Sequence, residues 1–266
     1  MSKIEICKKC KKRKLDLQKG IVCGLTDSKP EFEGTCPYFE KDEVVKEYEG
    51  SALKPNDQRA KALLSFIWIV LVLEIASLIS SGLQYNLLQT FSNGGEITDA
   101  AANANDMREQ IIAVLYLIAY IISGITFIMW FRRAYFNLHQ KANPLSFDEG
   151  WAAGCWFVPI VNLYRPYQIM KELYVETKKC LLDGDNSLQL DLTTNFLGIW
   201  WTLWIVNGIL GQIIFRLSRD ADTLSGLMSV TILSLISSVI GIGLAFVTIR
   251  VVRDYSSVEG LLISKE

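Results

Sequence analysis

Four cysteines near the N-terminus are the side chains of this sequence best suited to hold a metal ion. Cys7 and Cys10 form a C-x2-C pair, and Cys23 and Cys36 follow after two gaps of twelve residues. Four thiolates complete the tetrahedral shell of a structural zinc site, which leaves no position open for a substrate. The surrounding residues offer too little apolar surface for a core of their own. The spacing therefore predicts a small head stapled by zinc.

Two other interpretations of these cysteines stay open. They could form a disulfide pair or redox switch, or they could be reduced thiols in a cytoplasmic segment. The basic run Lys8–Lys14 suits the zinc interpretation, because positive charge offsets the surplus negative charge of four thiolates. The simplest interpretation of this run is a solvated face, followed by contact with anionic lipid headgroups. Nucleic acid binding is not expected.

A carboxylate in the middle of an apolar block is the second candidate for chemistry. Glu74 is the only charged residue in the four apolar blocks of the chain, and an ionisable group at that depth needs partners inside the protein. The pattern favours an interhelical hydrogen-bonded cluster, with a proton or cation relay as the other possibility. Counting inward from the helix ends places four further polar side chains at similar depth: Tyr120, Asn207, Ser237 and Ser238.

The elements that must position these groups are long and apolar. Half of the 266 residues are hydrophobic, and the mean hydropathy is +0.25. A run of about 20 apolar residues crosses a bilayer, so the blocks predict a polytopic helical membrane protein. The pair Gly208 and Gly211 would allow close helix approach. The blocks are Ala62–Gly82, Ile111–Phe131, Phe196–Phe215 and Gly226–Ile249.

A fifth apolar stretch, Trp151–Tyr164, is too short to cross the bilayer. Pro159 interrupts it, and an amphipathic segment suited to the membrane interface follows Pro166. We expect a re-entrant or interfacial helical hairpin here. If this stretch does not cross, the positive-inside rule favours four spans with both termini in the cytoplasm. The outer loops then contain three of the 27 lysines and arginines, namely Arg108, Arg216 and Arg219.

These patterns predict an all-α membrane protein. It would have four transmembrane helices, the re-entrant or interfacial hairpin and a small metal-stapled head with four cysteine ligands. The expected parts are the cytoplasmic head (1–50), a linker (51–61), the transmembrane domain (62–255) and a cytoplasmic tail (256–266). The tryptophans Trp200, Trp201 and Trp204 are typical of an aromatic belt at the membrane interface.

Three motifs resemble a known family. They are Trp130-x-Arg-x-Ala-Tyr-x-Asn137, the run Trp156-Phe-Val-Pro-Ile-Val-Asn-Leu-Tyr-Arg-Pro166, and Trp200-Trp-x-Leu-Trp204. Together they resemble the bacterial membrane family catalogued as domain of unknown function 4328, over roughly residues 60–255. The resemblance implies a multi-helix integral membrane domain and brings no activity or ligand set. The cysteine head resembles short heads on other bacterial membrane proteins and lies outside the family core.

No catalytic signature accompanies these features. His139 is the only histidine, and the sequence has no H-E-x-x-H or G-x-S-x-G motif. We therefore expect a non-enzymatic sensing, regulatory or scaffolding protein of the cytoplasmic (inner) membrane. The alternative is a small transporter or channel component that uses the polar cluster around Glu74. The expected partners are the lipid bilayer and, through the basic head, a cytoplasmic protein or anionic lipid, with oligomerisation left open.

Overall fold

The computed structural model divides the chain into two units, Met1–Ser51 and Ala52–Glu266, which are described separately. Lys8 and Lys9 of the basic run, residues 183–191 and residues 265–266 fall outside the described part of the chain. The described residues are 6–7, 10–16, 20–26, 28–29, 31–32, 36–40, 53–142, 144–182 and 192–264.

The first unit contains a small β-hairpin. Strands β1 (Arg13–Asp16) and β2 (Gly20–Cys23) pair in antiparallel fashion. Gly24 follows β2, and its N–H donates to the Lys12 carbonyl oxygen over 2.7 Å. A Cβ at Gly24 would lie 2.7 Å from that same oxygen, so only glycine fits without a shift of the backbone. The head therefore adds a two-stranded sheet to the predicted helical membrane part.

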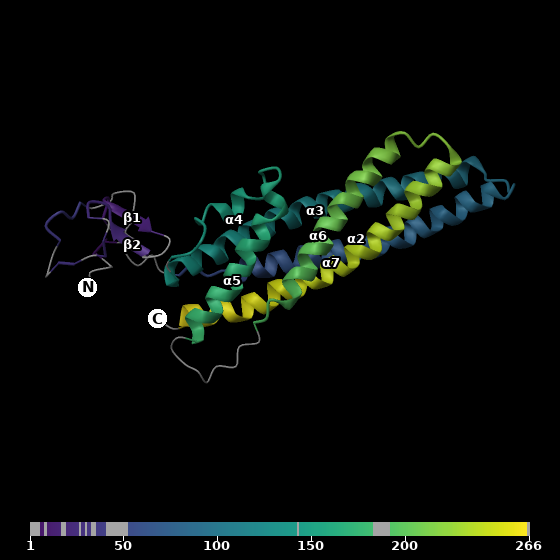
Figure 1. Ribbon diagram of the computed structural model, residues 1–266. Helices are drawn as coiled ribbons and strands as arrows, with labels where there is room; N and C mark the ends of the chain where they lie inside the picture. Colours follow the sequence, from purple (N-terminus) through teal and green to yellow (C-terminus); the bar gives the residue numbers. More distant parts are fainter. Residues whose placement is uncertain are drawn as a thin grey trace. The chain divides into compact units, whose positions relative to one another are not determined.

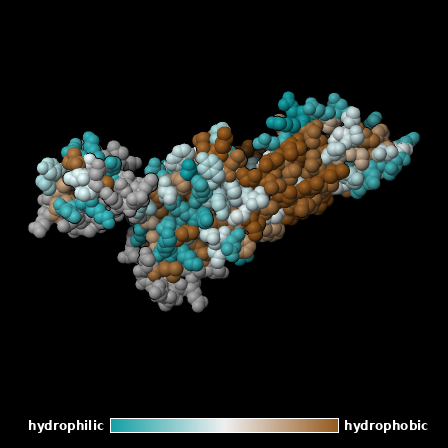
Figure 2. Space-filling view, viewed as in Figure 1, coloured by the Kyte–Doolittle hydropathy of each residue, from teal (hydrophilic) through white to brown (hydrophobic). Residues whose placement is uncertain are grey.

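The second unit is helical (Figure 1). Among the described residues four helices are long and apolar enough to cross a membrane, which confirms the predicted number by length and composition. Their apolar side chains point outward, and Figure 2 shows the resulting apolar band along the helices, with hydrophilic residues toward both ends. The elements are α2 (Asp57–Ser92), α3 (Asp99–Lys141), α4 (Trp151–Gly154), η1 (Val161–Leu163), α5 (Arg165–Leu182), α6 (Asn195–Arg219) and α7 (Leu224–Ser264).

Short turns join the helices at one end, which we call the loop end. Gly94 ends α2 with a φ of +83°, a left-handed conformation that suits glycine. Thr98 caps α3, because its hydroxyl accepts from the Ala101 N–H at 3.2 Å. Thr223 caps α7 in the same way, accepting from the Gly226 N–H at 3.1 Å.

The four long helices form an open arrangement rather than a closed bundle. Helix α2 packs against both α7 and α3, and α6 packs against α7. Along their described lengths α3 and α6 make no extensive contact with each other. The rings of Phe127 and Trp200 meet between them. A space therefore remains between α3 and α6.

Helix α5 marks the other end of the unit, which we call the α5 end (Figure 1). Its apolar face is buried against α3 and α7, with Met170, Leu173 and Tyr174 at most 2% exposed. The Tyr174 hydroxyl donates to the Val251 carbonyl oxygen of α7 over 2.6 Å. The predicted amphipathic helix is present, but its apolar face covers protein rather than lying in the membrane interface.

Helices α2 and α7 extend beyond their apolar blocks. Helix α2 begins at Asp57, inside the stretch expected to be a linker. Helix α7 runs on to Ser264 through most of the expected tail, where Val258, Glu259 and Leu262 are buried. These extensions carry the core of the α5 end, so the helical unit reaches further in both directions than residues 62–255.

The central stretch is not a helical hairpin. It consists of the four-residue α4, the three-residue η1 and an irregular turn at Pro159. Ile160 has a φ of +67°, a strained conformation for a β-branched residue. This turn leaves the side chains of Phe157 and Ile160 76% and 75% exposed, a surface suited to the membrane interface. Cys155 is fully buried, and burial raises the pKa of its thiol to about 11.

Candidate functional site

The Glu74 carboxylate joins three helices. It is 5% exposed, and it accepts a hydrogen bond of 2.7 Å from the hydroxyl of Tyr116 on α3. The Ser238 hydroxyl of α7 also interacts with it. Gly241, one turn further along α7, lies so close that a Cβ there would overlap the carboxyl group. The partners of the carboxylate come from the two helices that pack on α2, so its hydrogen bonds connect α2 to α3 and α7.

The other residues expected in this cluster lie beside it. Ser237 donates to the Asn207 side-chain oxygen over 3.2 Å, which links α7 to α6. Tyr120 stacks on Tyr116 with ring centroids 5.9 Å apart and is 46% exposed. The structure thus brings Glu74 together with Ser238, and Asn207 together with Ser237. Tyr116, one helical turn from Tyr120, makes the hydrogen bond expected of Tyr120.

Two adjoining cavities occupy the space between α3 and α6. The smaller one, of about 200 Å³, extends toward the α5 end and is bordered by Glu74. The larger one, of about 650 Å³, extends toward the loop end and is bordered by Arg216 and Arg219 of α6. Both are lined mainly by apolar atoms. Their walls share Tyr116, Tyr120 and Asn207, so we describe the two together as the α3–α6 groove.

Aromatic rings line the groove toward the α5 end. Phe127 of α3 stacks on Trp200 of α6 with centroids 5.8 Å apart. Trp156 contacts Phe127 and Trp204, both with centroids 5.5 Å apart. Trp201 stacks on Trp204 at 4.8 Å and donates from its ring nitrogen to the Leu163 carbonyl oxygen. The expected aromatic belt is therefore wrong for Trp200, which is 2% exposed and belongs to the core.

A family model matches residues 93–257, from the α2–α3 turn almost to the end of α7. Its description is Domain of unknown function (DUF4328). The chain belongs to this family. The match begins at residue 93 rather than near residue 60, so α2 lies before the DUF4328 segment. Comparisons with curated proteins and with solved structures returned no match.

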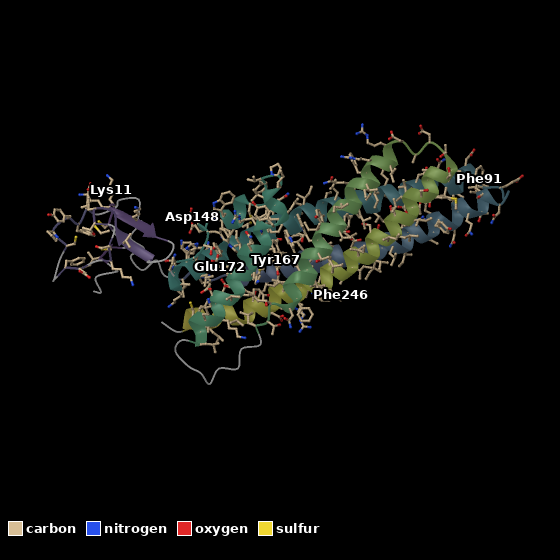
Figure 3. The ribbon with its side chains drawn as sticks, viewed as in Figure 1. Lys11, Phe91, Asp148, Tyr167, Glu172 and Phe246 are labelled. Atoms are coloured by element: carbon tan, nitrogen blue, oxygen red, sulfur yellow. The ribbon has the colours of Figure 1, made fainter. Side chains whose placement is uncertain are left out.

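The DUF4328 motif on α3 holds the α5 end together. Trp130, Tyr135 and Asn137 are each 0% exposed. The Trp130 ring nitrogen donates to Ser256 of α7 over 3.2 Å. The Tyr135 hydroxyl donates over 2.6 Å to Glu172, which lies on α5 (Figure 3). Each motif side chain thus fastens α3 to a different part of the core, which indicates an architectural role.

Asn137 belongs to a buried polar cluster that also includes Asn56 and Glu259. Its amide donates to Glu259 Oε1 at 2.8 Å and to the Lys54 carbonyl oxygen at 2.9 Å. The Lys54 N–H donates back to Asn137 Oδ1 at 3.0 Å. The Asn56 amide donates to both oxygens of Glu259 and to the Trp130 carbonyl oxygen. This cluster ties the chain before α2 to α3 and α7.

Three of the four head cysteines begin tight turns. Their carbonyl oxygens accept from the N–H three residues ahead: Cys7 from Cys10, Cys23 from Thr26, and Cys36 from Phe39. Among the described residues no group of three ligand-type side chains is placed to hold a metal ion. The metal-stapled geometry expected for the head is therefore not found in the described part of the chain.

The electrostatics of two head thiols differ. Burial raises the pKa of Cys7, and the charges of Cys36, Cys10 and Cys23 raise it further, so the four thiols share one neighbourhood. The pKa of Cys23 is lowered, chiefly by a hydrogen bond from the Leu25 backbone and also by Thr26. Backbone N–H groups directed at sulfur stabilise the thiolate form that binds metals.

The sequence did not identify several residues that these sites use. Tyr116 is such a case, although its spacing of four from Tyr120 places both on one face of α3. The sequence did not indicate that Asn56 and Glu259 meet, because each lies in a polar stretch and the two are far apart in the chain. Arg216 and Arg219 were noted only for their side of the membrane.

Proposed function

We propose that this protein is a non-enzymatic membrane sensor or scaffold that binds an amphipathic molecule of the bilayer in the α3–α6 groove. The groove is the observation that carries this proposal. Its two cavities adjoin at Tyr116, Tyr120 and Asn207, and its walls are apolar with a few polar groups. Such concave, mostly apolar spaces with a few polar side chains are typical of ligand sites.

The same geometry favours binding over passage. A transporter or channel would need a polar path along the groove, whereas the rings of Phe127, Trp156 and Trp200 line the groove toward the α5 end. The Glu74 carboxylate is occupied by Tyr116 and Ser238 rather than exposed as a relay group. Transport is the second candidate function, and it would require these aromatic rings to move apart.

The α5 end faces the cytoplasm in this proposal. The loop end contains only three of the 27 lysines and arginines, Arg108, Arg216 and Arg219. Because basic residues are retained on the cytoplasmic side, this distribution supports both termini and the cysteine head in the cytoplasm of an inner membrane. The basic head would there meet a cytoplasmic protein or anionic lipid.

Filling the groove should prevent ligand binding. Replacing Gly208 by phenylalanine places a ring in the larger cavity, where an added Cβ meets no other atom within 4 Å. We expect the purified wild-type protein to retain bilayer lipid after detergent washing, and the variant to retain about tenfold less. Lipid extracted from equal amounts of protein is quantified by mass spectrometry.

Gly82 provides the matched control for this experiment. It also lies on a long apolar helix, and an added Cβ there meets no atom within 4 Å, but it borders neither cavity. Gly82→Phe should retain lipid as the wild type does. Wild-type protein without bound amphiphile, or equal retention in the Gly208 and Gly82 variants, would refute the proposed function.

We also propose that Cys7, Cys10, Cys23 and Cys36 bind one structural zinc ion. The C-x2-C pair, the three tight turns at cysteines and the shared neighbourhood of the four thiols support this proposal. The lowered pKa of Cys23 favours the thiolate that zinc requires. Zinc would stabilise the head without taking part in a reaction.

Elemental analysis of the purified chain tests the zinc proposal. We expect about one zinc ion per chain, lost when Cys7 and Cys10 are both replaced by serine. Cys155→Ser is the control, since Cys155 is buried in the helical core and should leave the zinc content unchanged. Absence of metal from freshly purified wild-type protein would contradict the proposal.

A further inference from the structure

One face of α6 forms a wall of the larger cavity, in which Asn207 and Gln212 are the uncharged polar side chains. Gly208, Gly211 and Phe215 line it in succession, at the spacing of a single helix face. A Cβ on either glycine would meet no atom within 4 Å. These glycines were expected to bring helices together, yet here they widen the larger cavity, and we call the space above them the glycine-lined slot. Neighbouring apolar side chains of α6, such as Ile209 and Ile213, are exposed.

Two arginines border the same cavity at the loop end. Arg216 and Arg219 directly follow the apolar block of α6, where a membrane helix meets the headgroup region. Within the described residues neither of them forms an ion pair, although Asp220 and Asp222 are close in sequence. Arg219 lies over the Phe215 ring at 5.9 Å.

The remaining basic residue of the loop end is bound within the protein. The Arg108 guanidinium donates to the Ser80 hydroxyl at 2.8 Å and to the Asn105 side-chain oxygen at 2.6 Å. It also lies 3.9 Å from Glu109. The positive charge available at the loop end is therefore concentrated at the mouth of the α3–α6 groove, on Arg216 and Arg219.

The geometry points to an anionic phospholipid as the occupant of the groove, with its headgroup phosphate at Arg216 and Arg219. The glycine-lined slot takes one of its acyl chains. Cationic side chains at the membrane surface above an apolar slot complement a negative headgroup joined to a hydrocarbon chain. A second copy of this chain would instead need acidic residues facing these arginines. This inference rests on the proposed function and specifies its ligand class.

Native mass spectrometry of the delipidated full-length protein tests this assignment. Phosphatidylglycerol and phosphatidylcholine with identical acyl chains are titrated separately. We expect the wild type to bind phosphatidylglycerol roughly 10- to 30-fold more tightly, because two basic residues lie near the headgroup. Arg216→Gln combined with Arg219→Gln should abolish this preference, because it weakens phosphatidylglycerol binding more than phosphatidylcholine binding. Arg216→Lys combined with Arg219→Lys should keep most of it.

The control removes two positive charges from the other end of the unit, by Lys61→Gln and Arg132→Gln, and should keep the preference. Equal binding of both lipids by the wild type would overturn the headgroup assignment and leave the proposed function standing. A preference that survives in the glutamine variant would overturn it too. Failure to bind either lipid, or a lipid-free dimer, would overturn the proposed function as well.

Discussion

Replacing Asn137 by aspartate should lower the free energy of unfolding by about 3 kcal/mol or more. The Asn137 amide donates to Glu259, whose side chain is 3% exposed, and to the Lys54 carbonyl oxygen. Aspartate keeps the shape but removes the donor, so two carboxylates would face each other away from water. Lowering the pH should restore part of the stability, because a protonated carboxyl group can donate again.

The measurement is the temperature at which half of the detergent-purified protein leaves its monodisperse elution peak. For a chain of this size the expected decrease is about 6 °C or more. Asn86→Asp is the control, because Asn86 is an exposed residue of α2. Equal decreases in the two variants, or no recovery of Asn137→Asp at lower pH, would show that the Glu259 cluster does not stabilise the α5 end.

Gly241→Ala should lower the free energy of unfolding by about 1–3 kcal/mol. The new methyl group would overlap the Glu74 carboxyl group, which is held by Tyr116 and cannot move without losing that hydrogen bond. The overlap lies in the interface between α2 and α7, the most extensive helix pairing of the unit. The same elution assay measures the loss.

A double-mutant cycle identifies the cause. In a chain that already carries Glu74→Ala, the substitution Gly241→Ala should have little effect, giving a coupling of about 1 kcal/mol or more. Gly82→Ala serves as the control, because an added Cβ there meets no atom within 4 Å. Equal effects of Gly241→Ala with and without Glu74 would mean that the carboxyl group is not the obstacle.

The sequence predicted the membrane helices well, because bilayer thickness sets the length of an apolar block. It did not predict how far α2 and α7 continue beyond their blocks. The α7 extension is held by packing against α5, and the start of α2 by the hydrogen bonds of Asn56 to Trp130 and Glu259. These partners are distant in the chain. The irregular turn at Ile160 was also missed, since only the surrounding contacts impose its left-handed backbone.

Depth in the membrane could be predicted, but helix rotation could not. Counting from the helix ends placed Glu74 correctly near Asn207 and Ser238, yet selected Tyr120 where Tyr116 makes the bond. Two tyrosines one turn apart differ little in depth, and their roles depend on how α3 rotates against α2. The cavities could not be predicted either, because they exist only where α3 and α6 stay apart.

Helix α2 lies outside the segment that matches the DUF4328 model. The matched region begins at residue 93, after α2, yet α2 covers the face of α7 that contains Ser238 and Gly241. A fragment limited to the matched region would leave this face bare. The matched segment alone is therefore an incomplete folding unit, because one face of its last helix needs α2 as a cover.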